Sequence, residues 1–161
     1  MPVSTPLPEG HPFALVYAQA AALLLEQGDP IANAANMSAL IFNQIEHLNW
    51  AGFYFRQGQT LIVGPFQGQP ACVEIAWGKG VCGTAAATNQ TQRVDDVHEF
   101  DGHIACDAAS RSEVVVPLVR DGAVFGVLDI DSPNLARFSA TEQQGFEALA
   151  ALYTQRSRAI A

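Results

Sequence analysis

The chain has 161 residues, of which 49% are hydrophobic and 15% charged, so it has the length of one domain and enough apolar material for a core. This composition excludes disorder for most of the chain. Sixteen acidic and eight basic side chains give a net charge of −8, which argues against nucleic-acid binding and against attraction to an anionic membrane surface. No apolar stretch reaches the roughly 20 residues of a transmembrane helix, and residues 1–12 lack the basic start of a signal peptide. We therefore expect a cytoplasmic protein.

The predicted elements begin with two helices. Residues 1–12 contain four prolines and are predicted to be a flexible leader, followed by one domain over residues 13–161. Residues 13–27 are rich in Ala and Leu and end at Gly28, which predicts a first helix. In residues 31–47 apolar side chains recur at steps of three and four, which predicts a second.

The period then changes to that of short strands. Strands are predicted over residues 50–55, 60–63 and 73–77, followed by a short helix over 82–89. Residues 93–112 show little period of any kind.

The chain closes with a hairpin and a helix. Residues 113–119 and 123–130 are predicted strands, joined by the strong two-residue turn signal Asp121-Gly122. The hydroxyl side chains of Ser139 and Thr141 predict the start of a last helix that runs to about residue 158. Helices at both ends around a run of strands indicate an α+β fold with an antiparallel sheet.

Residues 94–107 form the most polar part of the chain. They contain five carboxylates, two histidines and one cysteine, and no Lys or Arg. A loop of this length in a small domain is more often functional than idle. The donors suit a metal, but no His-x-x-x-His or Cys-x-x-Cys spacing occurs, so we expect no metal site. A solvated acidic loop with one buried cysteine is the alternative.

Three carboxylates lie within or beside apolar strands. Because side chains alternate along a strand, Asp129 and Asp131 should share one face, and Glu113 opens the neighbouring strand of the hairpin. Acids so placed repel one another unless a cation or a shared proton lies among them, so at least one pKa should be raised. Alternatively the acids lie at strand ends in water, an account that suits Asp131 best.

Three further side chains are candidates for a site. Trp50 and Tyr54 lie four apart on a predicted strand, and therefore on one face, where they either wall a small pocket or fill the core. Cys82 follows a Gly-Lys-Gly turn at a predicted helix start, a position that favours the thiolate.

Five segments of the chain together resemble a known family: residues 50–54, 64–68, 80–85, 100–107 and 126–132. On these segments the chain is similar to the free methionine-(R)-sulfoxide reductases, which are built on a GAF domain, over about residues 38–152. Several long ungapped matches in the family's order make the resemblance specific. Gln69 departs from it, since the family's pattern predicts a basic residue there.

The resemblance implies a fold, an activity and partners. It implies a single GAF domain of the α+β class, with a central antiparallel sheet and helices from both chain ends packed against it. It implies a cytoplasmic oxidoreductase of the oxidative-stress response that reduces free L-methionine-(R)-sulfoxide through a cysteine sulfenic acid and an intramolecular redox-active disulfide. Thioredoxin would recycle the disulfide, so no cofactor is implied, and a homodimer is a reasonable expectation.

The resemblance also maps site residues onto this chain. The family's three cysteines, three acids and one indole correspond to Cys72, Cys82, Cys106, Glu113, Asp129, Asp131 and Trp50. Glu113 and Asp129 are expected to be catalytic, and together with Asp131 they are expected to meet the substrate. Trp50 and Tyr54 would complete the substrate-binding wall.

The positions of the cysteines suggest separate roles. Cys106 lies in the irregular acidic loop, where the backbone can present it to a ligand, so we expect it to attack the sulfoxide. Cys72 follows glycine and proline at the entrance to a strand and is expected to resolve the sulfenic acid first. Cys82, at its helix start, is expected to be more firmly packed and to act as a secondary partner.

Two other classes of function stay open at the level of sequence. A non-catalytic GAF module that senses a small ligand would need no role for the cysteines. A metal-dependent enzyme would use the acidic loop as its ligand source.

Overall fold

The computed structural model describes residues 7–104 and 106–160. Its helices are α1 (Ala14–Leu23), α2 (Pro30–Gln44), α3 (Gly80–Thr88) and α4 (Ala140–Arg156), with a short 3-10 helix η1 (Val97–Glu99). Its strands are β1 (Trp50–Gln57), β2 (Thr60–Gly68), β3 (Glu74–Ala76), β4 (Gln92–Val94), β5 (Ser112–Arg120) and β6 (Ala123–Ser132).

The six strands form one sheet in the order β3-β2-β1-β6-β5-β4, and all neighbours are antiparallel. The predicted hairpin between β5 and β6 is confirmed, with Arg120 opposite Ala123. Asp121 and Gly122 have φ values of +53° and +78°, as a two-residue turn between twisted strands requires. β1 and β6, which are far apart in the sequence, pair at the middle of the sheet.

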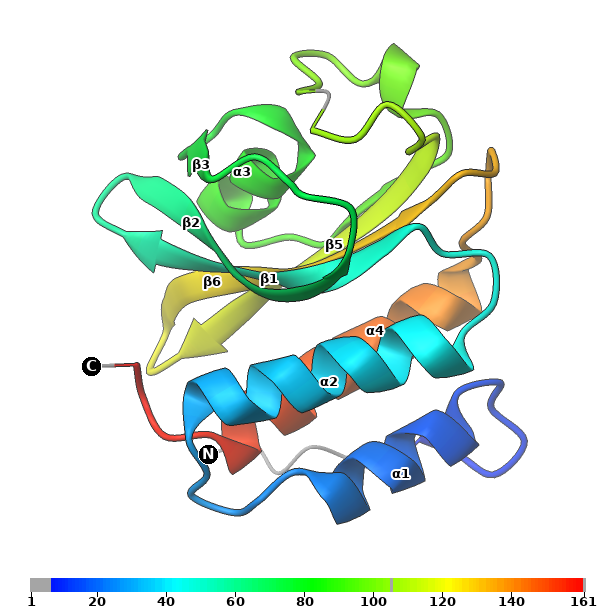
Figure 1. Ribbon diagram of the computed structural model, residues 1–161, viewed down its shortest axis with the longest axis vertical. Helices are drawn as coiled ribbons and strands as arrows, with labels where there is room; N and C mark the ends of the chain where they lie inside the picture. Colours follow the sequence, from blue (N-terminus) through cyan, green and yellow to red (C-terminus); the bar gives the residue numbers. More distant parts are fainter. Residues whose placement is uncertain (1–6, 105, 161) are drawn as a thin grey trace.

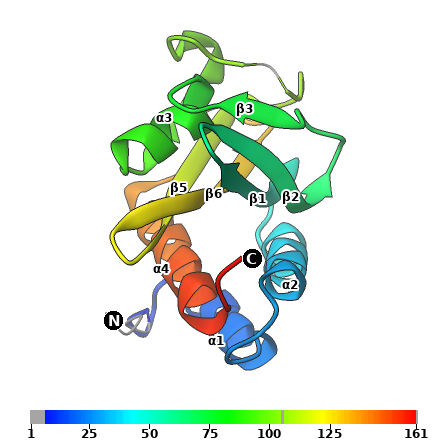
Figure 2. The ribbon, with the colours of Figure 1, turned by 90° about the vertical axis from the view of Figure 1, so that its left-hand side faces the viewer.

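Helices α1, α2 and α4 lie on one side of the sheet, and α3 lies on the other together with the loop before β5 (Figures 1 and 2). The side with three helices contains the larger apolar core. Its members alternate along each strand, as Leu128 and Ile130 do on β6, and pack against helix residues such as Met37 and Phe146. The predicted α+β architecture, with helices from both chain ends against an antiparallel sheet, is confirmed.

Local sequence explains why two of these helices begin where they do. Asp29 accepts hydrogen bonds from the backbone N–H groups of Ile31 and Ala32, and Pro30 follows at the first helical position of α2. Ser139 and Glu142 form a reciprocal capping box at the start of α4. The predicted hydroxyl cap of the last helix is therefore confirmed.

Some predicted boundaries are wrong. The first helix ends at Leu23 rather than residue 27, because Leu24 turns to an extended conformation and is buried in the core. The second ends at Gln44 rather than residue 47, where His47 has a positive φ. Residues 93–112, predicted to be irregular, contain most of β4 and all of η1. Elements of three residues are too short to show a period.

The leader predicted over residues 1–12 lies partly outside the described residues and stays a prediction. Within the described part, His11 contacts α4, since its Nε2 atom lies 3.0 Å from the carbonyl oxygen of Thr141. The backbone N–H of Phe13 donates to His11 Nδ1. Among the described residues, no helix has both the length and the apolar character needed to span a membrane.

Candidate active site

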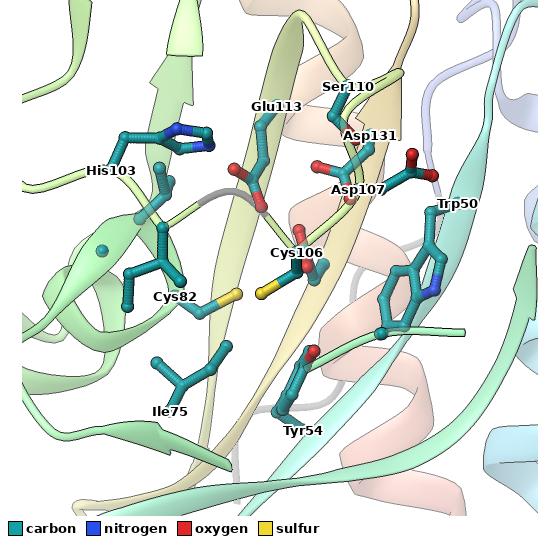
Figure 3. A pocket seen from close by; sticks show the side chains of 15 residues that line it. Trp50, Tyr54, Ile75, Cys82, His103, Cys106, Asp107, Ser110, Glu113 and Asp131 are labelled. Atoms are coloured by element: carbon teal, nitrogen blue, oxygen red, sulfur yellow. The ribbon is translucent and has the colours of Figure 1, made fainter. Parts of the chain in front are cut away.

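A cavity of about 40 Å³ lies between the sheet, α3 and the loop before β5 (Figure 3). Seven of the eight predicted site residues line it, and the eighth, Cys72, is bonded to one of them. The seven are Trp50, Tyr54, Cys82, Cys106, Glu113, Asp129 and Asp131. The fold therefore brings together residues from β1, α3, the loop, β5 and β6.

Strand register places the three acids side by side. Glu113 on β5 is directly opposite Asp131 on β6, and Asp129 lies two residues earlier on the same face. All three are buried, with at most 8% of each residue exposed. The predicted shared face is observed, and the alternative in which Asp131 ends its strand in water is wrong.

Burial dominates the electrostatics of these acids. It raises the pKa of Glu113 and of Asp131 well above their usual range, and the negative charge of Asp129 raises both further. Burial also raises the pKa of Asp129, but hydrogen bonds from Glu113 and Cys82 oppose that increase. Asp129 is therefore the acid that keeps the charge most readily, and Glu113 is the one that keeps a proton.

Cys82 is held against the sheet by a close approach of α3 to β3. A side chain at Gly83 would lie 2.6 Å from the Ala76 carbonyl oxygen, so only glycine permits this packing. Cys82 is a free thiol and is 4% exposed. Burial, followed by the charge of Asp129, raises its pKa well above the usual range. The prediction that a helix start favours the thiolate is wrong here, because desolvation and neighbouring acids outweigh the helix dipole.

Cys72 and Cys106 form a disulfide that links the segment before β3 to the acidic loop, with Cα atoms 5.2 Å apart. Tyr54 fixes the Cys72 side of this link, because its hydroxyl donates to the carbonyl oxygen of Cys72 at 3.0 Å. In Figure 3 the sulfur atoms of Cys82 and Cys106 point toward one another across the cavity. The structure thus pairs the two cysteines expected to be attacking and resolving thiols.

The aromatic wall is continuous along β1. The rings of Trp50 and Tyr54 stack with centroids 5.8 Å apart, and Phe66 on β2 also stacks on Trp50, at 5.1 Å. The Trp50 indole N–H donates to the Gln69 carbonyl oxygen, a backbone contact that the departure from the family pattern at Gln69 leaves possible. Trp50 and Tyr54 therefore both fill the core and wall the cavity.

Asn49 anchors the loop that carries Cys106. Its Nδ2 atom donates to Asp107 Oδ2 and to Ser110 Oγ, each at 3.0 Å, and Asp107 and Ser110 both line the cavity. Sequence analysis did not place Asn49 or Ser110 at the site. A single Asn before a strand carries no pattern that would reveal a contact with residues about sixty positions later.

His103 and Ile104 also line the cavity and were not predicted to be site residues. Ile104 lies over Gly80, where an added side chain would come within 3.3 Å of it. Burial and the nearby His98 lower the pKa of His103, so its ring is neutral near neutral pH.

One group of potential metal ligands lies in the cavity. One ligand atom each from Cys82, Glu113 and Asp129 lie within 4.8 Å of one another, and among residues 7–104 and 106–160 no other such group of three occurs. Its carboxylates come from strands rather than from the acidic loop that the sequence offered as a ligand source. The expectation of no metal site rested on motif spacing, which does not reveal ligands from separate elements.

Comparison of the sequence with known proteins supports a family assignment. The GAF domain family matches residues 32–155. The free methionine-R-sulfoxide reductase of Escherichia coli (strain K12) is 54% identical over 130 residues, which cover 81% of this chain and 79% of that protein.

Two solved structures agree with this assignment. Staphylococcus aureus fRMsr in complex with its substrate is 46% identical, with a TM-score of 0.86 over 94% of this chain and 98% of that one. The free methionine-R-sulfoxide reductase of Neisseria meningitidis, also in complex with its substrate, is 40% identical, with a TM-score of 0.83 over 86% and 84% of the two chains. This chain therefore belongs to the free methionine-R-sulfoxide reductase family of GAF-domain proteins.

Proposed function

We propose that this protein reduces free L-methionine-(R)-sulfoxide to methionine with its own cysteines. The Cys72–Cys106 disulfide carries the proposal, because it lies beside a cavity that also contains buried, proton-holding carboxyls. A GAF module that only senses a ligand would require neither feature. The identity of the substrate is inferred from relatives that are named free methionine-R-sulfoxide reductase. The chemistry is inferred from the residues of the cavity.

The first half-reaction transfers oxygen from the substrate to Cys106. The Cys106 thiolate attacks the sulfoxide sulfur while Glu113, whose raised pKa keeps it protonated, donates a proton to the oxygen. The oxygen then passes from the substrate sulfur to Cys106 Sγ as the bond between the two sulfur atoms breaks, so methionine leaves and Cys106 becomes a sulfenic acid. Asp129 accepts hydrogen bonds from both Glu113 and Cys82, so it holds the proton donor in place.

The second half-reaction restores the thiols. Cys72 attacks the Cys106 sulfenic acid, water leaves, and the disulfide of the present structure forms. A dithiol protein such as thioredoxin then reduces that disulfide by exchange. Cys82, buried and protonated, would replace Cys72 only when Cys72 is absent.

Substrate recognition follows from the charge of the cavity. Trp50 and Tyr54 provide an apolar wall for the thioether chain, and the strand carboxylates meet the ammonium group of a free amino acid. Glu113, Asp129 and Asp131 all lie on that lining. A peptide-bound sulfoxide has no such ammonium group to pair with these carboxylates.

The disulfide form is not ready for substrate. A cavity of about 40 Å³ holds about three water molecules, which is too little space for an amino acid. Reduction of the disulfide must therefore release the Cys106 segment before the substrate enters. This dependence makes the reductant part of the cycle and favours a cytoplasmic setting, where thiol reductants keep cysteines reduced.

We infer a homodimer because large apolar side chains of α1 and α2 are exposed, among them Leu15 at 68% and Ile31 at 50%. The leader over residues 1–12 would precede the GAF domain of residues 13–161 without contributing to the cavity.

Single-turnover release of methionine from the reduced enzyme tests the thiol roles. Cys106→Ser should release none, and Cys72→Ser should release about one equivalent per chain and then stop. Cys82→Ser is the matched control and should complete the cycle. A full burst from Cys106→Ser would contradict the assignment of the nucleophile.

A substrate panel in a thioredoxin-coupled assay tests the activity itself. Free methionine-(R)-sulfoxide should be reduced, whereas the free S epimer and a peptide-bound sulfoxide should not. Turnover of the peptide-bound sulfoxide alone would overturn the proposal.

A further inference from the structure

The cavity contains three potential metal-ligand atoms close together. The proposed reduction does not require all three to act on one ligand. Cys82, Glu113 and Asp129 offer one sulfur and two carboxylate oxygens within 4.8 Å of one another. All three residues are buried, and they belong to three different elements. A sulfur and two oxygens form a mixed soft and hard ligand set, of the kind that binds Zn²⁺ rather than Mg²⁺.

A second observation points to a ligand at the same place. Asp129 is 5% exposed and lines the cavity, and its Oδ1 atom is buried without a hydrogen-bond partner. A buried carboxylate oxygen of this kind loses its hydration without compensation unless a cation or a donor meets it. Among the described residues that line the cavity there is no Lys or Arg, so the protein itself provides no fixed cation.

The size of the cavity suits an ion. Its volume of about 40 Å³ holds a metal ion and a water ligand but not an amino acid. Ligand atoms on a tetrahedral Zn²⁺ lie about 3.5 Å apart, given bonds of about 2.0–2.3 Å. The three ligand atoms, which all lie within 4.8 Å of one another, are therefore at most about 1 Å farther apart than a bound ion requires. Ile104, which is 40% exposed, and the half-buried His103 line the same cavity.

We propose that Cys82, Glu113 and Asp129 bind a thiophilic divalent cation, Zn²⁺, in the disulfide form of the enzyme. Cys82 binds as the thiolate, and its proton passes to solvent together with any proton on the two carboxyls. Water completes the four-coordinate site. No oxidation state changes, because Zn²⁺ is not redox-active.

The disulfide form also makes the test specific. With Cys72 and Cys106 bonded, Cys82 is the single free thiol, so any thiolate-to-metal absorbance reports on it alone. Titration of the oxidised protein with Cd²⁺ should produce an ultraviolet thiolate-to-cadmium band that saturates at one ion per chain. Zn²⁺ should abolish the band by competition, and Mg²⁺ should not. No band, or competition by Mg²⁺ equal to that by Zn²⁺, would overturn the proposal.

Variants distinguish a specific Cd²⁺ site from non-specific attraction of the cation to carboxylates. Cys82→Ser should remove the band, and Asp129→Asn should weaken Cd²⁺ binding at least about tenfold. Asp107→Asn is the matched control, since Asp107 lines the same cavity outside the trio, and it should change the affinity less than about twofold. An equal loss in Asp107→Asn and Asp129→Asn would contradict the site. Should Cys82→Ser fail to fold, the pair of Asp variants still decides.

One consequence rests on the proposed function. A cation held by Cys82, Glu113 and Asp129 displaces the proton that Glu113 would donate, so Zn²⁺ should inhibit sulfoxide reduction, and a chelator should restore it. Turnover that is unimpaired at saturating Zn²⁺ would overturn this inhibitory role. A protein that binds Cd²⁺ as described but reduces no sulfoxide would contradict the proposed function and support the site.

Discussion

The two faces of the central sheet are built from alternate residues of the same strands and differ in chemistry. On β6, Leu128 and Ile130 point into the apolar core beneath α1, α2 and α4. Their neighbours Asp129 and Asp131 point to the cavity beneath α3. One face buries mainly apolar groups and no charged residue, whereas the other buries three carboxyls and a thiol in nearly equal exclusion from water. We call the side beneath α1, α2 and α4 the helix face, and its apolar core stabilises the fold. We call the side beneath α3 the cavity face, and its buried acids and thiol destabilise the fold but provide reactive groups.

The largest effect should come from Glu113, the proposed proton donor on the cavity face. Glu113→Gln keeps the shape of the side chain and removes the proton, so kcat/KM should fall by about 10²–10⁴-fold. The free energy of unfolding should fall little or rise, because a buried acid is replaced by a neutral amide. Paired measurements of kcat/KM and of urea denaturation check this. A variant with wild-type kcat/KM would show that Glu113 is only structural.

The helix face should respond in the opposite way. Leu128 is fully buried next in sequence to Asp129, and Leu128→Ala should lower the free energy of unfolding by about 2–5 kcal/mol. Its kcat/KM, measured where the variant is folded, should change less than about threefold because the methyl groups never face the cavity. A large loss of kcat/KM in a well-folded variant would break the distinction between the faces.

A smaller effect concerns how stability depends on pH. Burial raises the pKa of Asp131 well above its ordinary value of 3.8, so the folded chain keeps a proton that the unfolded chain releases. The stability that this group contributes is full below about pH 4 and is lost as the pH rises toward the folded pKa. Between about pH 5 and about pH 8, the free energy of unfolding should therefore decrease with rising pH in the wild type. The decrease should be less steep in Asp131→Asn. An unchanged slope would mean that Asp131 is ionised in the folded state.

Much of this contrast between the two faces could be predicted from the sequence. It depends on the alternation of side chains along strands and on a local turn sequence. Alternation placed Asp129 and Asp131 on one face, and Asp121-Gly122 fixed the hairpin that brings Glu113 opposite Asp131. The pKa of Cys82 could not be predicted, since the direction of its shift depends on burial and on acids from other strands. Asn49 was equally invisible, because its contacts with the Cys106 loop exist only after folding.

The smallest expected effect tests whether the two faces are independent. Ser139 caps α4 by accepting from the Glu142 backbone N–H, and Ser139→Ala should lower the free energy of unfolding by about 1 kcal/mol. Thr141→Ala is the matched control in the same turn, because Thr141 is exposed and its side chain has no capping role; its effect should stay within about 0.5 kcal/mol. Thermal denaturation of both variants measures the difference.

Neither substitution should alter kcat/KM, since α4 packs on the face opposite the cavity (Figure 1). Fraying of one helix end removes local stability without moving Glu113 or Asp129, which are held by strand pairing at the middle of the sheet. A loss of kcat/KM in Ser139→Ala but not in Thr141→Ala would mean that the end of α4 is coupled through β5 to the acids. The cavity would then depend on the helix face for its geometry as well as for its stability.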